Sequence, residues 1–155
     1  QLIMTLFNGN TGNMTYEIIP INSENYNLVV DFIKNMGESK KTFRYFDNRE
    51  ISVLKNHVLT CVLNYKNRII GYGHLDTENN KTWLGISIID NFKGMGFGKI
   101  LMNYLVTNAK EKNLKQIYLT VDKNNISAIS LYKKFNFIII ETTVKYFLMK
   151  LDLNE

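Results

Sequence analysis

Apolar residues follow two different periods along the chain, one typical of helices and one typical of strands. The helical stretches begin near residues that favour helix starts, or after a glycine-rich segment. The predicted helices run from Asn22 or Ser23 to Gly37, from Asp47 or Asn48 to Asn56, from about Ile100 to Lys112, and from Asn124 or Asn125 to Phe135. Runs of β-branched and aromatic residues predict strands at Tyr16–Ile19, His57–Tyr65, Arg68–Leu75, Trp83–Ile89, Gln116–Val121, Phe137–Glu141 and Val144–Leu151.

The order of these elements is β-α-α-β-β-β-α-β-α-β-β, which favours the α/β (α+β) class. It predicts a mixed, mostly antiparallel sheet of six or seven strands with helices on both faces. Lys66-Asn67 is expected to close a hairpin, whereas Thr42–Asp47 and Asp76–Lys81 are expected to be irregular. No repeat or change of composition divides the chain, so we predict one domain over residues 14–155.

The first thirteen residues differ from the rest, because they carry three asparagines and two glycines and no sustained apolar period. They also lack the basic flank and long apolar centre of a signal peptide. We expect residues 1–13 to be a disordered leader or residues added in cloning.

The composition excludes several classes of protein. A chain of 155 residues with 45% hydrophobic residues suits one globular domain. Apolar runs such as Ile138–Ile140 are far shorter than the roughly 20 residues of a membrane-spanning helix. The single cysteine, Cys61, excludes an internal disulfide and a cysteine-rich metal site. We therefore expect a cytoplasmic protein, and the frequent Lys, Asn and Ile favour a bacterial source.

The formal net charge of +5 is compatible with a nucleic acid, an anionic membrane or a phosphorylated small molecule as partner. The lysines form no block of five or six like charges, so most of them are expected at the solvated surface. Neither a basic stripe nor a reading helix is evident, and we expect no nucleic-acid or membrane partner.

A glycine-rich turn, Lys93-Gly94-Met95-Gly96-Phe97-Gly98-Lys99, carries the strongest chemical signal. Glycines let a backbone approach a ligand closely, and the start of the next helix offers N–H groups suited to phosphate. Ile100 stands where a Walker loop needs a hydroxyl, and the glycine spacing does not fit a dinucleotide fingerprint. A turn without a ligand stays the alternative.

Two segments resemble the signatures of the GCN5-related N-acetyltransferase (GNAT) family. The acetyl-CoA signature, Arg/Gln-x-x-Gly-x-Gly/Ala, is matched as Lys93-x-x-Gly96-x-Gly98. A second family segment is matched by Asn125, Ala128, Leu131, Tyr132, Lys134 and Phe137. The segments occur in the family's order and spacing, so the chain resembles this family from about Met14 to Leu151.

The resemblance implies acetyl-CoA as cosubstrate, no metal, and a general-acid role for Tyr132 at the thioester sulfur. It implies cofactor contacts from Ile86, Ile88, Lys93, Gly94, Met95, Gly96, Phe97, Gly98, Lys99 and Asn125. The chain departs from the family at Lys93, at Asp90 in place of a common proline, and at Asn136 in place of a glycine. Trp83 occupies a strand position where many relatives carry a glutamate base.

Acetylation requires an uncharged amine, so a base must be sought elsewhere. His74 is our candidate, because Gly71 and Gly73 would open room beside it and Asp76 shares its strand face. A hydrogen-bonded structural histidine is the alternative for His74. Asp76, Glu50 or a chain of waters are alternative bases, and His57 is expected to be structural.

The aromatic segment Phe43–Phe46 with Arg44 and Arg49 falls where relatives build the acceptor site. The expected activity is acetylation of a primary amine on a small molecule by direct attack in a ternary complex. An amino sugar or sugar nucleotide is favoured, with a polyamine, an amino acid or a peptide amine as alternatives. A CoA-binding sensor without catalysis is the second function considered. The family often forms dimers, so a homodimer stays open.

Overall fold

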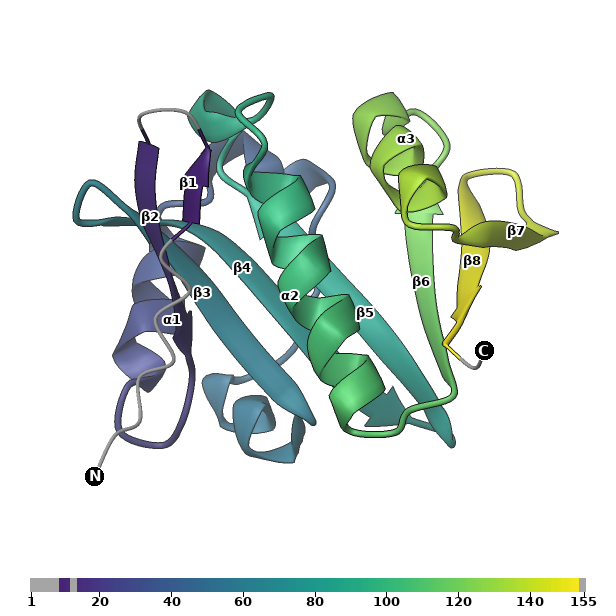
Figure 1. Cartoon of the computed structure of the whole chain (residues 1–155), viewed down its shortest axis with the longest axis horizontal. Coiled ribbons are helices and arrows are strands. Elements are labelled where there is room, and N and C mark those ends of the chain that lie inside the picture. The colour runs from purple at the N-terminus through teal and green to yellow at the C-terminus, as the bar shows by residue number, and fades with distance from the viewer. Residues whose placement is uncertain (1–8, 12–13, 154–155) are drawn as a thin grey trace.

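A computed structural model describes residues 9–11 and 14–153 of the chain (Figure 1). Its strands are β1 (Gly9–Thr11), β2 (Met14–Pro20), β3 (Leu59–Tyr65), β4 (Arg68–Glu78), β5 (Lys81–Ile88), β6 (Gln116–Asp122), β7 (Ile138–Thr142) and β8 (Tyr146–Asp152). Its helices are α1 (Tyr26–Lys34), α2 (Phe97–Glu111) and α3 (Ile126–Lys134), with short 3₁₀ helices η1 (Gly37–Lys41), η2 (Ile51–Asn56) and η3 (Asp90–Phe92). Of the expected leader, residues 1–8 and 12–13 lie outside the described residues, and Gly9–Thr11 pair with β2.

The described strands form one sheet in the order β1-β2-β3-β4-β5-β6-β8-β7. Every neighbouring pair is antiparallel except β5 and β6, which are parallel and in register only at Trp83 opposite Tyr118. Figure 1 shows these two strands nearest at that end and separating toward their C-terminal ends. The predicted mixed, mostly antiparallel sheet is confirmed, and the short β1 brings the described strands to eight.

Two tight turns join the three central strands. Lys66 and Asn67 both have positive φ, 50° and 61°, as the predicted hairpin requires. The expected loop over Asp76–Lys81 is wrong, because β4 and β5 continue to Glu78 and Lys81 and close a second hairpin. Asn79 and Asn80 make its turn with φ of 54° and 62°, a conformation that asparagine tolerates better than most residues.

Two helix boundaries also differ from the prediction. The expected helix after Asp47 or Asn48 is only the 3₁₀ helix Ile51–Asn56, closed by i→i+3 bonds such as Val53 N–H to Glu50 O at 3.1 Å. Six residues with two β-branched side chains are too few for a stable α-helix. Helix α2 starts inside the glycine-rich turn, at Phe97, with Gly96 before it.

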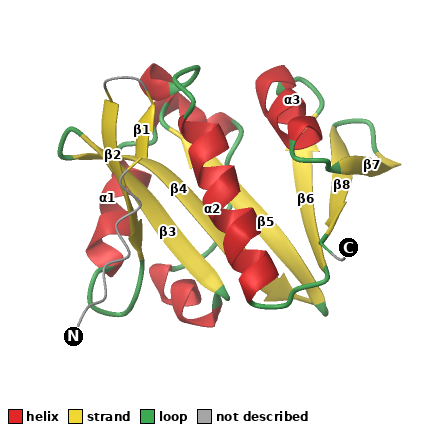
Figure 2. Ribbon diagram, in the orientation of Figure 1, coloured by secondary structure: helices red, strands yellow, loops and turns green. Residues whose placement is uncertain are grey.

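The sheet is covered on both faces, as predicted (Figure 2). On one face, α2 and α3 bury a large apolar cluster that includes Leu101, Leu105 and Ile129. On the other, α1 and η2 bury a smaller one around Phe32 and Tyr72. Full burial of a side chain such as Leu101 contributes about 1.5–3 kcal/mol, so these clusters hold the helices and the open end of β5 in place.

Candidate active site

A cavity of about 1100 Å³ lies where β5 and β6 separate. Its lining comes from the glycine-rich turn, the open end of β5, the last residues of β6, the helix α3, the outer half of β4 and the loop from Thr42 to Arg49. The cavity therefore connects the α2 and α3 side of the sheet with the α1 side. It brings together, from six parts of the sequence, most of the residues in which chemistry was expected.

The glycine-rich turn forms one end of this cavity. Gly94 and Gly96 have φ of 78° and 89°, which L side chains rarely adopt, and a β-carbon at either would meet nothing within 4 Å. This turn is therefore shaped by backbone conformation. It is followed by the first N–H groups of α2, which have no partner within the helix. Lys93 and Lys99 also line the cavity, and Lys93 forms an ion pair with Asp90 at 2.7 Å.

Met95 and Phe97 are the two expected cofactor residues that do not line the cavity. The Phe97 side chain is buried in the core, with its ring 5.1 Å from that of Tyr65. The Met95 side chain is half-buried against the same core. Only main-chain contacts of these two residues stay open as predictions.

The open edge of β5 forms the floor of the cavity. Ile86 and Ile88 line it, and their main chain is registered with β4 but not with β6. Such an edge offers N–H and C=O groups to an extended ligand in the manner of an added strand. The residues present thus fit the pantetheine arm that the sequence analysis expects here.

Helix α3 places Asn125 and Tyr132 on the cavity. Asn125 precedes the helix, and its side-chain oxygen accepts a hydrogen bond from Ala128 N–H at 3.4 Å. The Tyr132 side chain is buried, which raises the pKa of its phenol, so the hydroxyl is protonated at neutral pH. No described residue hydrogen-bonds this hydroxyl, and it is not sealed from solvent. Tyr132 can therefore donate its proton into the cavity.

His74 lines the cavity, but only 2% of its surface is exposed. Its Nδ1 shares a hydrogen bond of 2.7 Å with the Tyr72 hydroxyl. Burial, with His57 and Arg49 nearby, holds the pKa of His74 well below its usual value, so the ring is neutral at pH 7. A β-carbon at Gly85 would lie 2.6 Å from the His74 ring, which explains the glycine on the facing strand.

A hydrogen-bonded group that the sequence pattern does not predict lies beside His74. The Tyr45 hydroxyl donates to Asp76 Oδ2 at 2.9 Å and is 2.7 Å from His57 Nε2. His57 Nδ1 is 2.8 Å from the Thr60 hydroxyl. Burial lowers the pKa of His57 and, with the hydrogen bond to Asp76, raises that of Tyr45. No sequence pattern links Tyr45 with residues 12 and 31 positions away.

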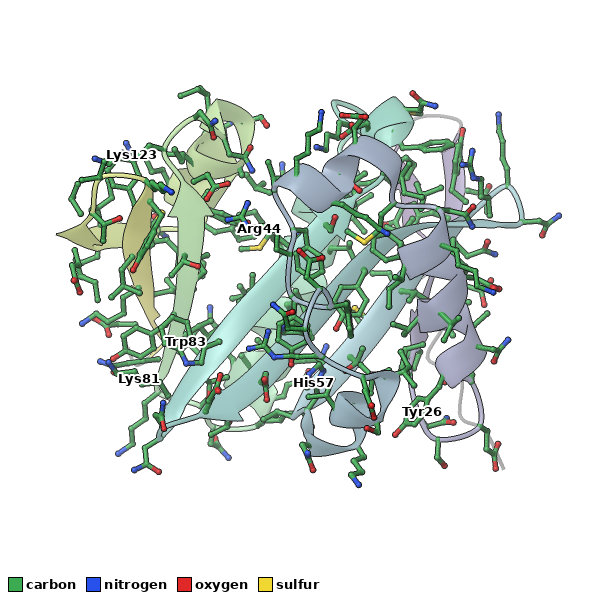
Figure 3. The ribbon with its side chains drawn as sticks, turned by 180° about the vertical axis from the view of Figure 1, so that it is seen from behind. Tyr26, Arg44, His57, Lys81, Trp83 and Lys123 are labelled. Carbon is green, nitrogen blue, oxygen red and sulfur yellow. The ribbon has the colours of Figure 1, made fainter. Side chains whose placement is uncertain are left out.

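Both arginines of the aromatic segment have partners inside the chain. Arg44 forms a two-pronged ion pair with Asp122, with both N–O distances at 3.1 Å. Figure 3 shows Arg44 over the opening between β5 and β6. Arg49 lies over the Tyr45 ring at 4.2 Å and donates to the Tyr45 carbonyl. Both guanidinium groups are therefore already engaged by partners within the chain.

Three other residues considered in the sequence have different surroundings. Trp83 lines the cavity, with its ring 5.7 Å from that of Tyr118. Glu50 precedes η2 and is not among the lining residues. Cys61 is fully buried, which raises the pKa of its thiol and keeps it protonated.

Comparisons with known proteins agree with this architecture. Residues 22–137 match the Acetyltransferase (GNAT) family. The chain is 34% identical over 99 residues to a ribosomal protein bS18-alanine N-acetyltransferase of Haemophilus influenzae, covering 61% of this chain and 67% of that protein. It is 39% identical over 64 residues to a spermine/spermidine N(1)-acetyltransferase of Bacillus subtilis, covering 40% of this chain and 42% of that protein. The second match thus spans less than half of the relative.

A solved structure of an N-acetyltransferase from Thermoplasma acidophilum, in complex with coenzyme A, shares the fold at a TM-score of 0.69 and 18% identity. It covers 90% of this chain and 99% of that chain. The chain belongs to the GNAT family and is an acyl-CoA N-acyltransferase of that type. No helix in the described part is long and apolar enough to cross a membrane. The described residues hold no group of three or more His, Cys, Asp or Glu suited to a metal ion.

Proposed function

We propose that this protein transfers the acetyl group of acetyl-CoA to a primary amine by direct attack in a ternary complex. The observation that carries the proposal is one continuous cavity that follows the open edge of β5. It has the glycine-rich turn and lysines at one end and carboxylates at the other. Holding amine and thioester together in such a cavity can contribute roughly 7–11 kcal/mol to lowering the barrier.

The residues at the cofactor end have distinct tasks in this proposal. Main-chain N–H groups from Gly94 to Lys99 bind the pyrophosphate, aided by the charge of Lys99, while Lys93 is paired with Asp90 beside them. The open main chain at Ile86 and Ile88 orients the pantetheine arm. When bound, acetyl-CoA supplies the thioester carbonyl that the amine attacks, and Tyr132 donates a proton to the departing sulfur.

The acceptor end favours a cationic amine over the anionic acceptor expected from the sequence. Arg44 is neutralised by Asp122, and Arg49 is engaged with Tyr45, so neither supports binding of a phosphate. Asp76 and Glu78 line this end, on the same face of β4 as His74. Trp83, opposite Asp76, adds an aromatic face that suits a cation. We propose an acceptor with a second positive charge, as in a polyamine.

An amine panel tests both parts of the proposal. Thiol release from acetyl-CoA is followed with spermidine, a peptide with an N-terminal alanine, and an amino-sugar phosphate, and the acetylated product is identified by mass spectrometry. We expect the highest kcat/KM with spermidine. A preference for the amino-sugar phosphate would refute the cationic acceptor. Binding of acetyl-CoA without turnover of any amine would refute the activity.

Glu78→Gln provides a matched variant for the charge argument. It removes one negative charge at the acceptor end and keeps the size of the side chain. We expect a KM for spermidine that is raised about threefold to tenfold, and a smaller change for a monoamine of similar length. Equal changes for both amines would contradict a role for the charge.

A further inference from the structure

A directional hydrogen-bonded chain ends on Asp76. The Asp76 carboxylate can only accept, so the single hydroxyl proton of Tyr45 points to its Oδ2. The Tyr45 oxygen must then accept from His57 Nε2 at 2.7 Å, which assigns the proton of His57 to Nε2. Burial keeps His57 neutral, so its Nδ1 accepts from the Thr60 hydroxyl at 2.8 Å. In this series of hydrogen bonds, every donor points in the same direction, from Thr60 toward Asp76.

Asp76 lies between this series of hydrogen bonds and the cavity. Its side chain is 13% exposed and lines the cavity. Tyr45 occupies Oδ2, and no described residue hydrogen-bonds Oδ1. Asp76 lies opposite Trp83 in the β4–β5 ladder, and opposite residues share a face of the sheet. One oxygen is therefore held by the protein, while the other can meet a ligand.

The charges around His74 oppose its use as the proton acceptor. A proton on His74 would create a buried cation close to His57 and Arg49, both of which oppose it. The Asp76 carboxylate instead attracts the ammonium that must lose the proton.

We propose that Asp76 takes the proton from the acceptor ammonium, and that Tyr45 and His57 are positioning residues that hold its carboxylate. This inference rests on the proposed function. In the step, an N–H bond of the ammonium breaks, its electron pair stays on nitrogen, and the proton goes to Asp76 Oδ1. The neutral amine then attacks the thioester carbonyl as the C–S bond breaks, and Tyr132 protonates the departing sulfur. The second proton released by the nitrogen restores the Tyr132 phenol, and the carboxylic acid returns its proton to solvent as the product leaves.

The titratable and charged groups near Asp76 come from three parts of the chain. They are Tyr45 and Arg49 from the loop before η2, His57 at the end of η2, and Tyr72, His74 and Glu78 on its own strand. Any pH profile therefore needs the variants below to separate Asp76 from these neighbours.

The kinetic test is the pH dependence of kcat/KM for one amine, with wild type and Asp76→Asn. With a base, the wild type is expected to have a nearly flat profile between about pH 7 and 9, since the ammonium is the bound form. Asp76→Asn should lose about 100-fold or more at pH 7. Its rate should then rise about tenfold per pH unit toward the amine pKa near 10, as free amine replaces the missing base.

Two comparisons separate this role from a structural one. Glu78→Gln changes a carboxylate two residues along the same face, and it should keep the flat profile whatever its KM. Tyr45→Phe and His57→Leu should lower kcat about tenfold with KM changed less than twofold. His57→Gln should recover most of that loss, because its amide N–H can still donate to Tyr45. A flat pH profile for Asp76→Asn would overturn the proposal. So would a sloping profile that appears only when His74 is substituted.

A second readout needs no acetyl-CoA and no activity. The ¹⁵N chemical shifts of the His57 ring report its tautomer in the free protein, and we expect the proton on Nε2. In Tyr45→Phe this Nε2 proton loses its acceptor, so its NMR signal should disappear through exchange with solvent. A His57 proton found on Nδ1 would reverse the chain and overturn the proposal. Amine turnover by the wild type tests the proposed function separately.

Discussion

Gly85 allows a direct test of how the buried histidine is packed. A β-carbon at this position would lie 2.6 Å from Cε1 and Nε2 of His74, against about 3.4 Å for ordinary contact. Gly85→Ala therefore requires a displacement of about 0.8 Å, the difference between these two distances. The ring has little freedom, because Tyr72 holds Nδ1 at 2.7 Å and the Tyr45 ring is centred 4.4 Å away. We expect a loss of about 1–3 kcal/mol in the free energy of unfolding.

Urea unfolding of a double-mutant cycle measures this contact. His74→Ala removes the obstructing ring, so Gly85→Ala in that background should be neutral or stabilising by up to about 1 kcal/mol. Gly73→Ala is the matched control, since its β-carbon would meet a movable methyl of Leu105 at 3.0 Å. It should cost less than Gly85→Ala. If the effects of Gly85→Ala and His74→Ala simply add, the steric argument is wrong.

Three further predictions concern the cavity and the buried histidine. Tyr132→Phe should lower kcat about 100-fold with acetyl-CoA binding retained, because it removes a proton donor that makes no hydrogen bond within the described part of the chain; an unchanged kcat would exclude this role. Gly96→Ala should weaken acetyl-CoA binding in calorimetry and destabilise the chain by about 1–2 kcal/mol, because residue 96 has φ of 89°; unchanged values would show that the turn tolerates a side chain. The pKa of His74 is lowered from 6.5 in the folded protein. The free energy of unfolding therefore falls as the pH drops below 6.5, because the unfolded chain then binds a proton that the folded one does not. Unfolding at pH 7 and 5 should show a decrease of about 1 kcal/mol per unit from this group, and His74→Asn should lose that part of the slope.

Local patterns predicted most of the elements, and the errors have local causes. The Lys66-Asn67 turn was predicted because runs of β-branched and aromatic residues flank it on both sides. The Asn79-Asn80 turn has similar positive φ values, but the polar residues around it are typical of a loop. The 3₁₀ helix after Glu50 was predicted as an α-helix because a short apolar run does not distinguish the two.

The site was predictable only where a contiguous motif carries it. The glycine-rich turn and the Asn125 to Tyr132 segment are read along the chain, and both line the cavity. The pairing of Arg44 with Asp122 joins residues 78 positions apart, and it changes the expected charge of the acceptor. The chain from His57 through Tyr45 to Asp76 depends on strand register and loop packing. No periodicity along the sequence expresses those contacts.

Hydrogen exchange of the main-chain amides, measured with and without acetyl-CoA, tests whether acetyl-CoA binds in this cavity. We expect slower exchange in two segments, the open edge of β5 at 86–88 and the glycine-rich turn at 94–99. The amides of β7, on the far edge of the sheet, should exchange at the same rate in both conditions. Saturating acetyl-CoA that protects neither segment, or protects residues elsewhere instead, would contradict the assignment of this cavity as the acetyl-CoA site.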